Sequence, residues 1–190
     1  MQILVSASVD YQALTQDGVF MAVRKILIWP NRKLSGISLA VEEGEDITEL
    51  VQDLTETMES RDGAGIAAPQ VGENVGVFLI APYIAGLDGD DPQVFINPEL
   101  TWVSEEKVKE QEGCLSFPDI WIHIERPAKC RMKATNMDGE EFEVEADGIY
   151  ARALQHEFDH LNGTLMTDFV GKLKQDMVRK KLKKLKKLRK

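Results

Sequence analysis

The feature that most constrains the fold of this 190-residue chain is the segment His156-Glu157-Phe158-Asp159-His160. It lies within an apolar repeat of Leu154, Phe158 and Leu161, which predicts a helix from about 147 to 162. Histidines four residues apart share one face of such a helix, so both imidazoles can bind one metal ion. Glu157 lies beside that face and can act as a base toward an attacking water.

A catalytic metal site of this kind usually takes three protein ligands, so the two histidines need a third. The two common zinc-protease solutions are absent, because no Glu follows Glu157 and Met166 stands where a third histidine would come. The other histidine, His123, lies on a predicted strand, where a lone His is more often structural. We therefore expect the ligand upstream, and the loop 112–118 offers Cys114.

Each of the two cysteines has a plain structural alternative, because free Cys is often a small buried hydrophobe. For Cys114 that alternative stays open beside the metal-ligand interpretation, whereas for Cys130 it is the favoured one. Two cysteines also argue against a disulfide framework and favour a reducing compartment.

Composition predicts a folded protein with a sizeable core: 43% of the residues are hydrophobic and 29% are charged, with a mean hydropathy of −0.25. These values exclude disorder and collagen-like or low-complexity scaffolds. No apolar run reaches the roughly 20 residues of a membrane helix. No Lys or Arg precedes Arg24, so the basic start of a signal peptide is missing. We expect a cytoplasmic protein.

The net charge of −9 conceals an acidic body and a basic end. Residues 171–190 contain eleven Lys or Arg and a single acid, Asp176, so this segment carries +10. One interpretation is a solvated helix that packs through Leu182, Leu185 and Leu188. The other is a surface for ribosomal RNA, because such a charge attracts phosphates.

The remaining pattern predicts an α+β fold with mainly antiparallel sheets packed around the central HExxH-bearing helix, followed by a C-terminal helix. A first helix is expected between Asp46 and Gly63, and the last one starts at about Phe169. A glycine-rich turn is expected at 63–70. Strands are expected at 26–29, 75–80, 94–97, 120–124 and 142–144.

Three segments resemble the motifs of the peptide deformylase family: GAGIAAPQ at 63–70, EGCLSFP at 112–118 and QHEFDHLNG at 155–163. The resemblance spans about residues 24 to 168. It implies an N-terminal extension at 1–20, a catalytic domain at 21–168 and a basic C-terminal helix at 169–190. It also implies metal-dependent hydrolysis of the formyl group from the N-terminal formylmethionine of newly made polypeptides, with release of formate.

The resemblance further implies a role for individual residues. One divalent ion, typically Fe2+ with Zn2+ or Ni2+ as possible substitutes, would bind Cys114, His156 and His160. Glu157 would carry the proton from water to the leaving amine. The side-chain amide of Gln70 and the backbone N–H of Leu115 would donate to the oxyanion.

Substrate contacts follow from the same resemblance. Gly65 and Gly113 would lie against the substrate backbone, although a tight turn would also need glycine there. Ile149 and Ala153 would form the pocket for the methionine side chain, although a core-facing helix would show the same pattern. The implied partners are nascent formyl-Met polypeptides and, through the basic helix, the ribosome, without DNA or membrane.

Two further ideas concern the surroundings of this site. Glu112 is expected to pair with Arg126 and brace the Cys114 loop, while Trp121 and Arg152 are expected at the pocket edge. Two other function classes stay open at this point. One is a different metal-dependent amidase or peptidase, and the other is a non-catalytic RNA-binding or ribosome-binding protein led by the basic tail.

Overall fold

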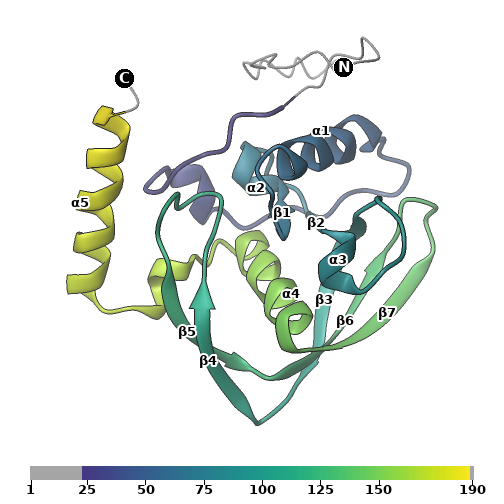
Figure 1. The fold of residues 1–190 in the computed structure, drawn as a ribbon. Helices are drawn as coiled ribbons and strands as arrows, with labels where there is room; N and C mark the ends of the chain where they lie inside the picture. The colour runs from purple at the N-terminus through teal and green to yellow at the C-terminus, as the bar shows by residue number, and fades with distance from the viewer. Residues whose placement is uncertain (1–22, 189–190) are drawn as a thin grey trace.

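The computed structural model describes residues 23–188, so the predicted extension at 1–20 lies outside the described residues. The fold is α+β, with antiparallel strands around a central helix and a separate C-terminal helix, as expected (Figure 1). One sheet has the strand order β1-β2-β3-β6-β7, and a two-stranded sheet consists of β4 and β5.

The strands are β1 (Gly65–Ala67), β2 (Val77–Ile80), β3 (Gln93–Val103), β4 (Lys107–Glu112), β5 (Ile122–Pro127), β6 (Lys129–Thr135) and β7 (Glu141–Asp147). The helices are α1 (Thr48–Glu59), α2 (Ala68–Val71), α3 (Pro82–Ala85), α4 (Gly148–Leu161) and α5 (Lys172–Leu188). Two 3-10 turns, η1 (Arg32–Ser35) and η2 (Met166–Phe169), complete the described elements.

The five-stranded sheet carries a different apolar cluster on each face, because side chains alternate along a strand. From β2, Phe78 and Ile80 pack with Leu154 of α4. Val77 and Leu79, the alternate residues, pack instead with a cluster that includes Leu54 of α1. Since all four of these β2 residues are fully buried, helices α4 and α1 cover opposite faces of the strand.

Helix α4 begins directly after β7, and Gly148 makes this reversal possible with a φ of 53°. Its inner face contributes Ala151, Leu154 and Leu161 to the core. The buried residues of α4 also include the polar group Arg152, Gln155, His156, Glu157 and His160. A helix that buries this many polar side chains has to satisfy them on the face that does not pack on the sheet.

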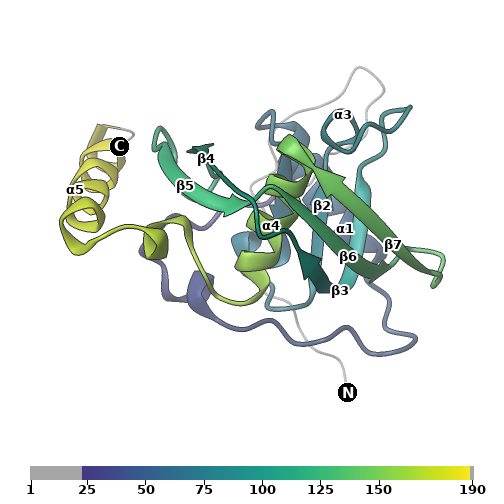
Figure 2. The ribbon, with the colours of Figure 1, turned by 90° about the horizontal axis from the view of Figure 1, so that it is seen from below.

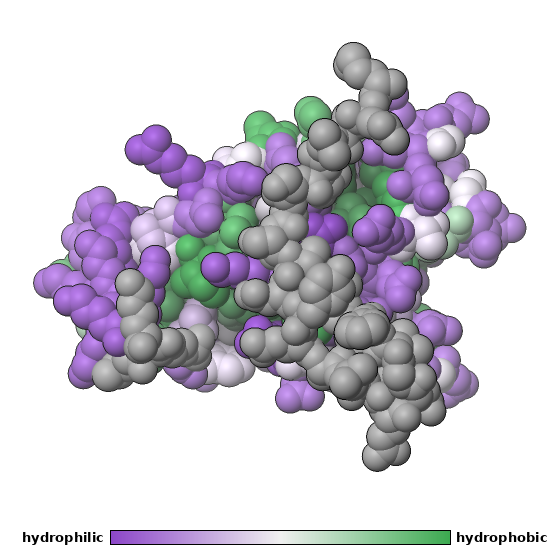
Figure 3. Space-filling model, turned by 90° about the horizontal axis from the view of Figure 1, so that it is seen from above, coloured by the Kyte–Doolittle hydropathy of each residue, from purple (hydrophilic) through white to green (hydrophobic). Residues whose placement is uncertain are grey.

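Helix α5 lies at one side of the molecule, beyond β5 (Figures 1 and 2). Val178 and Leu182 are buried and Leu185 is partly buried, in a cluster that includes Ile122 and Ile124 of β5. The edge of the molecule where α5 lies is mostly hydrophilic in Figure 3. The expected amphipathic helix is therefore present, with its leucine face against the body; the side chain of Leu188 lies outside the described residues.

Several local predictions were wrong. Residues 26–29 form no strand, because Leu27 N–H donates to the carbonyl of Gln70 and Trp29 N–H to that of Ser116, both outside the sheets. Helix α1, by contrast, lies between Asp46 and Gly63 as expected; it starts at Thr48, whose N–H donates to the Asp46 carboxylate. Helix α5 starts at Lys172, after η2.

The sequence pattern also missed strands. The expected glycine-rich turn contains β1, which pairs antiparallel with β2. Strand β4 was missed because five of its six residues are exposed, so it has no apolar alternation to detect. Strand β6 was not predicted either. Among the described residues, no helix combines the length and the apolar character that a membrane crossing requires.

Replacement of Met132 by Ala tests the main core. Met132 lies on β6 and is fully buried in the cluster that α4 covers. We expect Met132→Ala to lower the free energy of unfolding by about 2–5 kcal/mol, because the cavity left behind relaxes only partly. Urea unfolding followed by circular dichroism measures this, and an unchanged midpoint would contradict the assigned packing.

Candidate metal centre

Three potential metal ligands converge from two elements. His156 and His160 project from α4, and Cys114 lies in the loop two residues after β4. Their donor atoms all lie within 4.8 Å of one another, and Cys114 Sγ is 3.3 Å from His160 Nε2. The two imidazole rings meet edge to face with centroids 5.1 Å apart. The predicted set Cys114, His156 and His160 is thus brought together in the fold.

The surroundings of the histidines fit a cation. His156 Nδ1 lies 3.0 Å from Glu112 Oε2, which fixes the ring and leaves Nε2 as the nitrogen for a ligand bond. Burial lowers the pKa of His160 well below 6.5, which keeps this imidazole in the neutral form that binds metals. One thiolate and two imidazoles suit a divalent transition metal ion, so the residues present fit the metal that the site implies.

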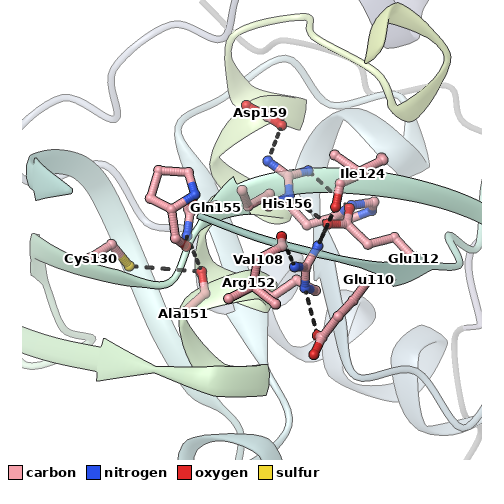
Figure 4. A network of polar contacts seen from close by, with 12 residues as sticks. Val108, Glu110, Glu112, Ile124, Cys130, Ala151, Arg152, Gln155, His156 and Asp159 are labelled. Carbon is pink, nitrogen blue, oxygen red and sulfur yellow. Dashed lines mark hydrogen bonds and ion pairs between the residues drawn. The ribbon is translucent and has the colours of Figure 1, made fainter. Parts of the chain in front are cut away.

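The Glu112 carboxylate occupies the centre of a polar network (Figure 4). Arg126 donates to both of its oxygens, at 2.6 and 2.9 Å, which confirms the expected pair. Arg152 donates to Oε1 at 2.6 Å. Burial alone would raise the pKa of Glu112, but the hydrogen bonds from His156 and Arg126 outweigh it and lower the pKa to about 2. Glu112 is therefore a fixed, ionised brace.

Glu157 is buried beside the two histidines, and its carboxylate is hydrogen-bonded less completely than that of Glu112. Its Oε2 has no hydrogen-bond partner among the described residues. Burial raises the pKa of Glu157 to about 7. A carboxyl group with such a pKa can both accept and release a proton near neutral pH.

Gly65 lies directly against Glu157. A Cβ at this position would be 2.8 Å from Glu157 Oε1, a distance that such atoms do not show, and 3.0 Å from Leu79 O, which is a tight contact. The backbone of β1 therefore approaches the Glu157 carboxylate so closely that a side chain at position 65 would displace it. This reason for glycine differs from the two interpretations drawn from the sequence, which were a turn and a substrate contact.

Gln70 is held by both ends of its amide. Its Oε1 accepts from Ala67 N–H at 2.8 Å, which turns Nε2 toward the cysteine loop. There Nε2 lies 3.5 Å from Cys114 Sγ and 3.3 Å from Ser116 Oγ. The amide N–H groups of Gln70 therefore point at the candidate metal site.

Most of these groups line one cleft of about 820 Å³, a size typical of ligand pockets. Its lining includes the predicted residues Gly65, Gln70, Gly113, Cys114, Leu115, Ile149, Ala153, His156 and Glu157. His160 lies beneath them and is 1% exposed. The ring of Trp121 covers Gly113, where a Cβ would come within 2.9 Å of it.

Two other predictions concern residues away from the metal ligands. Cys130 is fully buried, and burial raises the pKa of its thiol to about 11, so it is the inert cysteine that the sequence favoured. Arg152 lines the cleft as expected, but its guanidinium is buried against Glu112. Sequence reasoning missed this contact, because a single Arg on a helix gives no signal of a partner forty residues away.

Comparison with known proteins agrees with this geometry. A family model described as polypeptide deformylase matches residues 23–176. The chain belongs to the polypeptide deformylase family. The enzyme class expected from the sequence, a peptide deformylase, is thereby confirmed.

This chain matches individual relatives over nearly their full length. The peptide deformylase of Bradyrhizobium sp. strain ORS 278 is 43% identical over 168 residues, which is 86% of this chain and 96% of the relative. The crystal structure of a peptide deformylase from Legionella pneumophila superimposes with a TM-score of 0.82 at 37% identity, covering 88% of this chain and 98% of that one. The crystal structure of the peptide deformylase from Ehrlichia chaffeensis in complex with actinonin superimposes with a TM-score of 0.79 at 38% identity, covering 85% of this chain and 96% of that one.

Gly65→Ala tests the close approach of β1 to Glu157. We expect kcat/KM for a formyl-Met peptide to fall about 10- to 100-fold, because a misplacement of about 1 Å within a site can lower the rate about 100-fold. Formate release measures it.

The matched control for this prediction is Gly171→Ala, since a Cβ there meets nothing within 4 Å. Wild-type activity in the Gly65→Ala variant would refute the steric assignment.

Proposed function

We propose that this deformylase hydrolyses the formyl group of N-terminal formylmethionine on newly made polypeptides and releases formate and a free α-amine. The observation that carries the proposal is the convergence of Cys114, His156 and His160 within 4.8 Å, beside the buried carboxylate of Glu157. Family membership supports the same substrate.

The metal ligands in this proposal are Cys114 Sγ and one nitrogen from each of His156 and His160. We propose Fe2+ as the native ion, and the same donors also accept Zn2+ or Ni2+. When bound, the ion supplies Lewis-acid chemistry that polarises the formyl oxygen and makes water a better nucleophile near neutral pH.

Glu157 has the role of proton carrier. Its unpartnered Oε2 takes a proton from the attacking water as the new bond to the formyl carbon forms. The same oxygen then gives that proton to the nitrogen as the C–N bond breaks. Water thus contributes one hydroxyl to formate and one hydrogen to the amine, so the atoms balance.

The oxyanion donors are proposed to be Gln70 and Leu115. Because Ala67 N–H holds Gln70 Oε1, the amide N–H groups need no reorientation to reach a developing charge beside Cys114. The backbone N–H of Leu115 follows Cys114 directly and belongs to the same wall of the cleft. Donors that are oriented before the reaction stabilise the charge at little reorganisation cost.

The substrate is proposed to lie between β1 and the cysteine loop. β1 is the edge strand of the five-stranded sheet, so the side of Gly65 away from β2 can pair with an extended peptide. Gly113 lines the same cleft. Ile149 and Ala153, one turn apart on α4, line the cleft and would receive the methionine side chain.

Glu157→Gln tests the proposed proton carrier. The amide keeps the shape of the side chain but cannot accept the proton, so we expect kcat to fall at least about 100-fold while metal content stays unchanged. The assay is formate release by anaerobically prepared Fe2+ protein from a short formyl-Met peptide. Full activity in the variant would refute the role.

An acetyl-Met peptide in the same assay distinguishes a deformylase from a broader amidase. We expect a deformylase to leave the acetyl peptide uncleaved. Cleavage of both peptides at similar rates would favour the alternative of a general metal-dependent amidase or peptidase.

We also propose that α5 docks the enzyme on the ribosome, in the cytoplasm, while the catalytic unit spans 21–168. The support is its charge: Lys180, Lys183, Lys184 and Lys187 are all exposed, whereas Val178 and Leu182 hold the helix to the body. A charged face on a helix that is already anchored suits a phosphate-rich partner.

Replacing those four lysines by Gln tests the docking without exposing the core. We expect ribosome affinity to fall and its salt dependence to become shallower, because fewer counterions are released on binding. Activity on short peptides should stay unchanged. Ribosome co-sedimentation at several salt concentrations measures the affinity.

The matched control replaces Lys107, Lys109, Lys129 and Lys133, which are exposed on the body, by Gln. Equal losses in both variants would mean that binding follows total charge and that α5 is not the docking element.

A further inference from the structure

Arg152, on the wall of the cleft, makes four polar contacts with the small sheet. Its Nη1 donates to Glu112 Oε1 at 2.6 Å and to Ile124 O at 3.1 Å. Its Nη2 donates to Val108 O at 2.8 Å, and its Nε lies 3.2 Å from Glu110 Oε2. The guanidinium thus contacts both strands of the small sheet, while the residue itself belongs to α4 (Figure 4).

These contacts connect two parts of the protein that each carry metal ligands. The histidines lie on α4, which packs on the five-stranded sheet, whereas Cys114 follows β4. Among the described strands, β4 pairs only with β5 and makes no ladder with the larger sheet. No strand ladder with the larger sheet therefore fixes the cysteine loop relative to α4, and the side-chain contacts between the helix and the small sheet contribute to its position.

Arg152 and His156 act on the same carboxylate from one helix face. They lie four residues apart, so their side chains are neighbours on α4. Arg152 donates to Oε1 of Glu112 and His156 Nδ1 contacts Oε2. Arg126 also donates to both oxygens, and the two contacts from α4 hold the same carboxylate from the side of the helix.

The charges along this network alternate in sign. Asp159 contacts Arg126 at 2.8 Å, Arg126 contacts Glu112, and Glu112 contacts Arg152, which reaches Glu110. Removing Arg152 would leave the buried Glu112 with one arginine instead of two. A buried carboxylate that loses a partner moves toward water or other donors, which would shift the bond to His156.

We propose that Arg152 is a positioning residue for the metal site: it fastens the sheet that carries Cys114 to the helix that carries His156 and His160. It acts through Glu112 and touches no reacting group, since its donors are occupied by protein oxygens. The inference rests on the proposed metal site and concerns how tightly that site retains its ion.

Arginine suits this role better than other residues. Its planar fork can donate to a carboxylate and to two carbonyl oxygens at once. Lysine would bring the charge but could not span these acceptors. Methionine would keep much of the apolar stem that lines the cleft and would remove every donor.

The test measures metal release. Wild-type protein and Arg152→Met are loaded with Co2+, whose absorption from the cysteine thiolate reports occupancy, and a chelator in excess starts the release. We expect Arg152→Met to lose Co2+ at least about 10-fold faster, within the range found when an outer partner of a metal ligand is removed. Arg152→Lys should fall between the two, and it carries the test if the Met variant does not fold.

Two controls separate positioning from general loss of stability. Arg131→Met makes the same chemical change on a surface arginine that pairs with Glu145, and it should release Co2+ like the wild type. Met132→Ala weakens the core without touching Glu112 and should also release Co2+ at the wild-type rate.

The results that would refute the proposed function differ from those that would refute this inference. Arg152 variants that release Co2+ at the wild-type rate, or no faster than Met132→Ala, would overturn the positioning role whether or not formate is produced. A wild-type protein that holds Co2+ but forms no formate with Fe2+ would refute the proposed function and leave this inference standing. A wild-type protein that fails to bind Co2+ would overturn both.

Discussion

The site depends on the hydrogen bonding of one buried carboxylate. Glu112 receives two donors from Arg126, one from Arg152 and a contact from His156, so four nitrogen atoms from three side chains converge on two oxygens. Removing a charge from water costs free energy that only such complete pairing offsets. The carboxylate therefore has one stable position, and that position orients His156 and places Cys114, two residues further along the chain.

Two parts of the fold, each packed around its own apolar cluster, carry the metal ligands. The five-stranded sheet and α4 share a continuous apolar cluster that fixes the two histidines. The small sheet and α5 share another cluster, against which Cys114 packs. Because the ligands come from both parts, the candidate metal centre exists only when the two clusters are correctly joined.

Close contacts at glycine complete the arrangement. Gly65 lets the edge strand approach Glu157, and Gly113 lets Trp121 lie over the backbone next to Cys114. At both positions a side chain would occupy space that the neighbouring group already fills. The cleft is thus shaped by the absence of two side chains as much as by those that line it.

The sequence determined the elements whose signals are local. The period of apolar residues gave α4 within one residue at each end, and two histidines four apart on it had to share a face. Resemblance across three motifs added Cys114, which spacing alone had left open. Strand β4 was not predicted because four of its six residues are charged and five are exposed, so the alternation that marks a half-buried strand is missing.

Only the tertiary structure decided which distant polar groups meet. No periodicity links Arg152 to Glu112, forty residues earlier, or reveals that Gly65 lies against Glu157. The physical reason is the distance along the chain over which a sequence pattern carries information. Helix and strand patterns reflect neighbours along the chain, whereas the desolvation that makes a buried ion pair necessary arises only after separate elements have packed together.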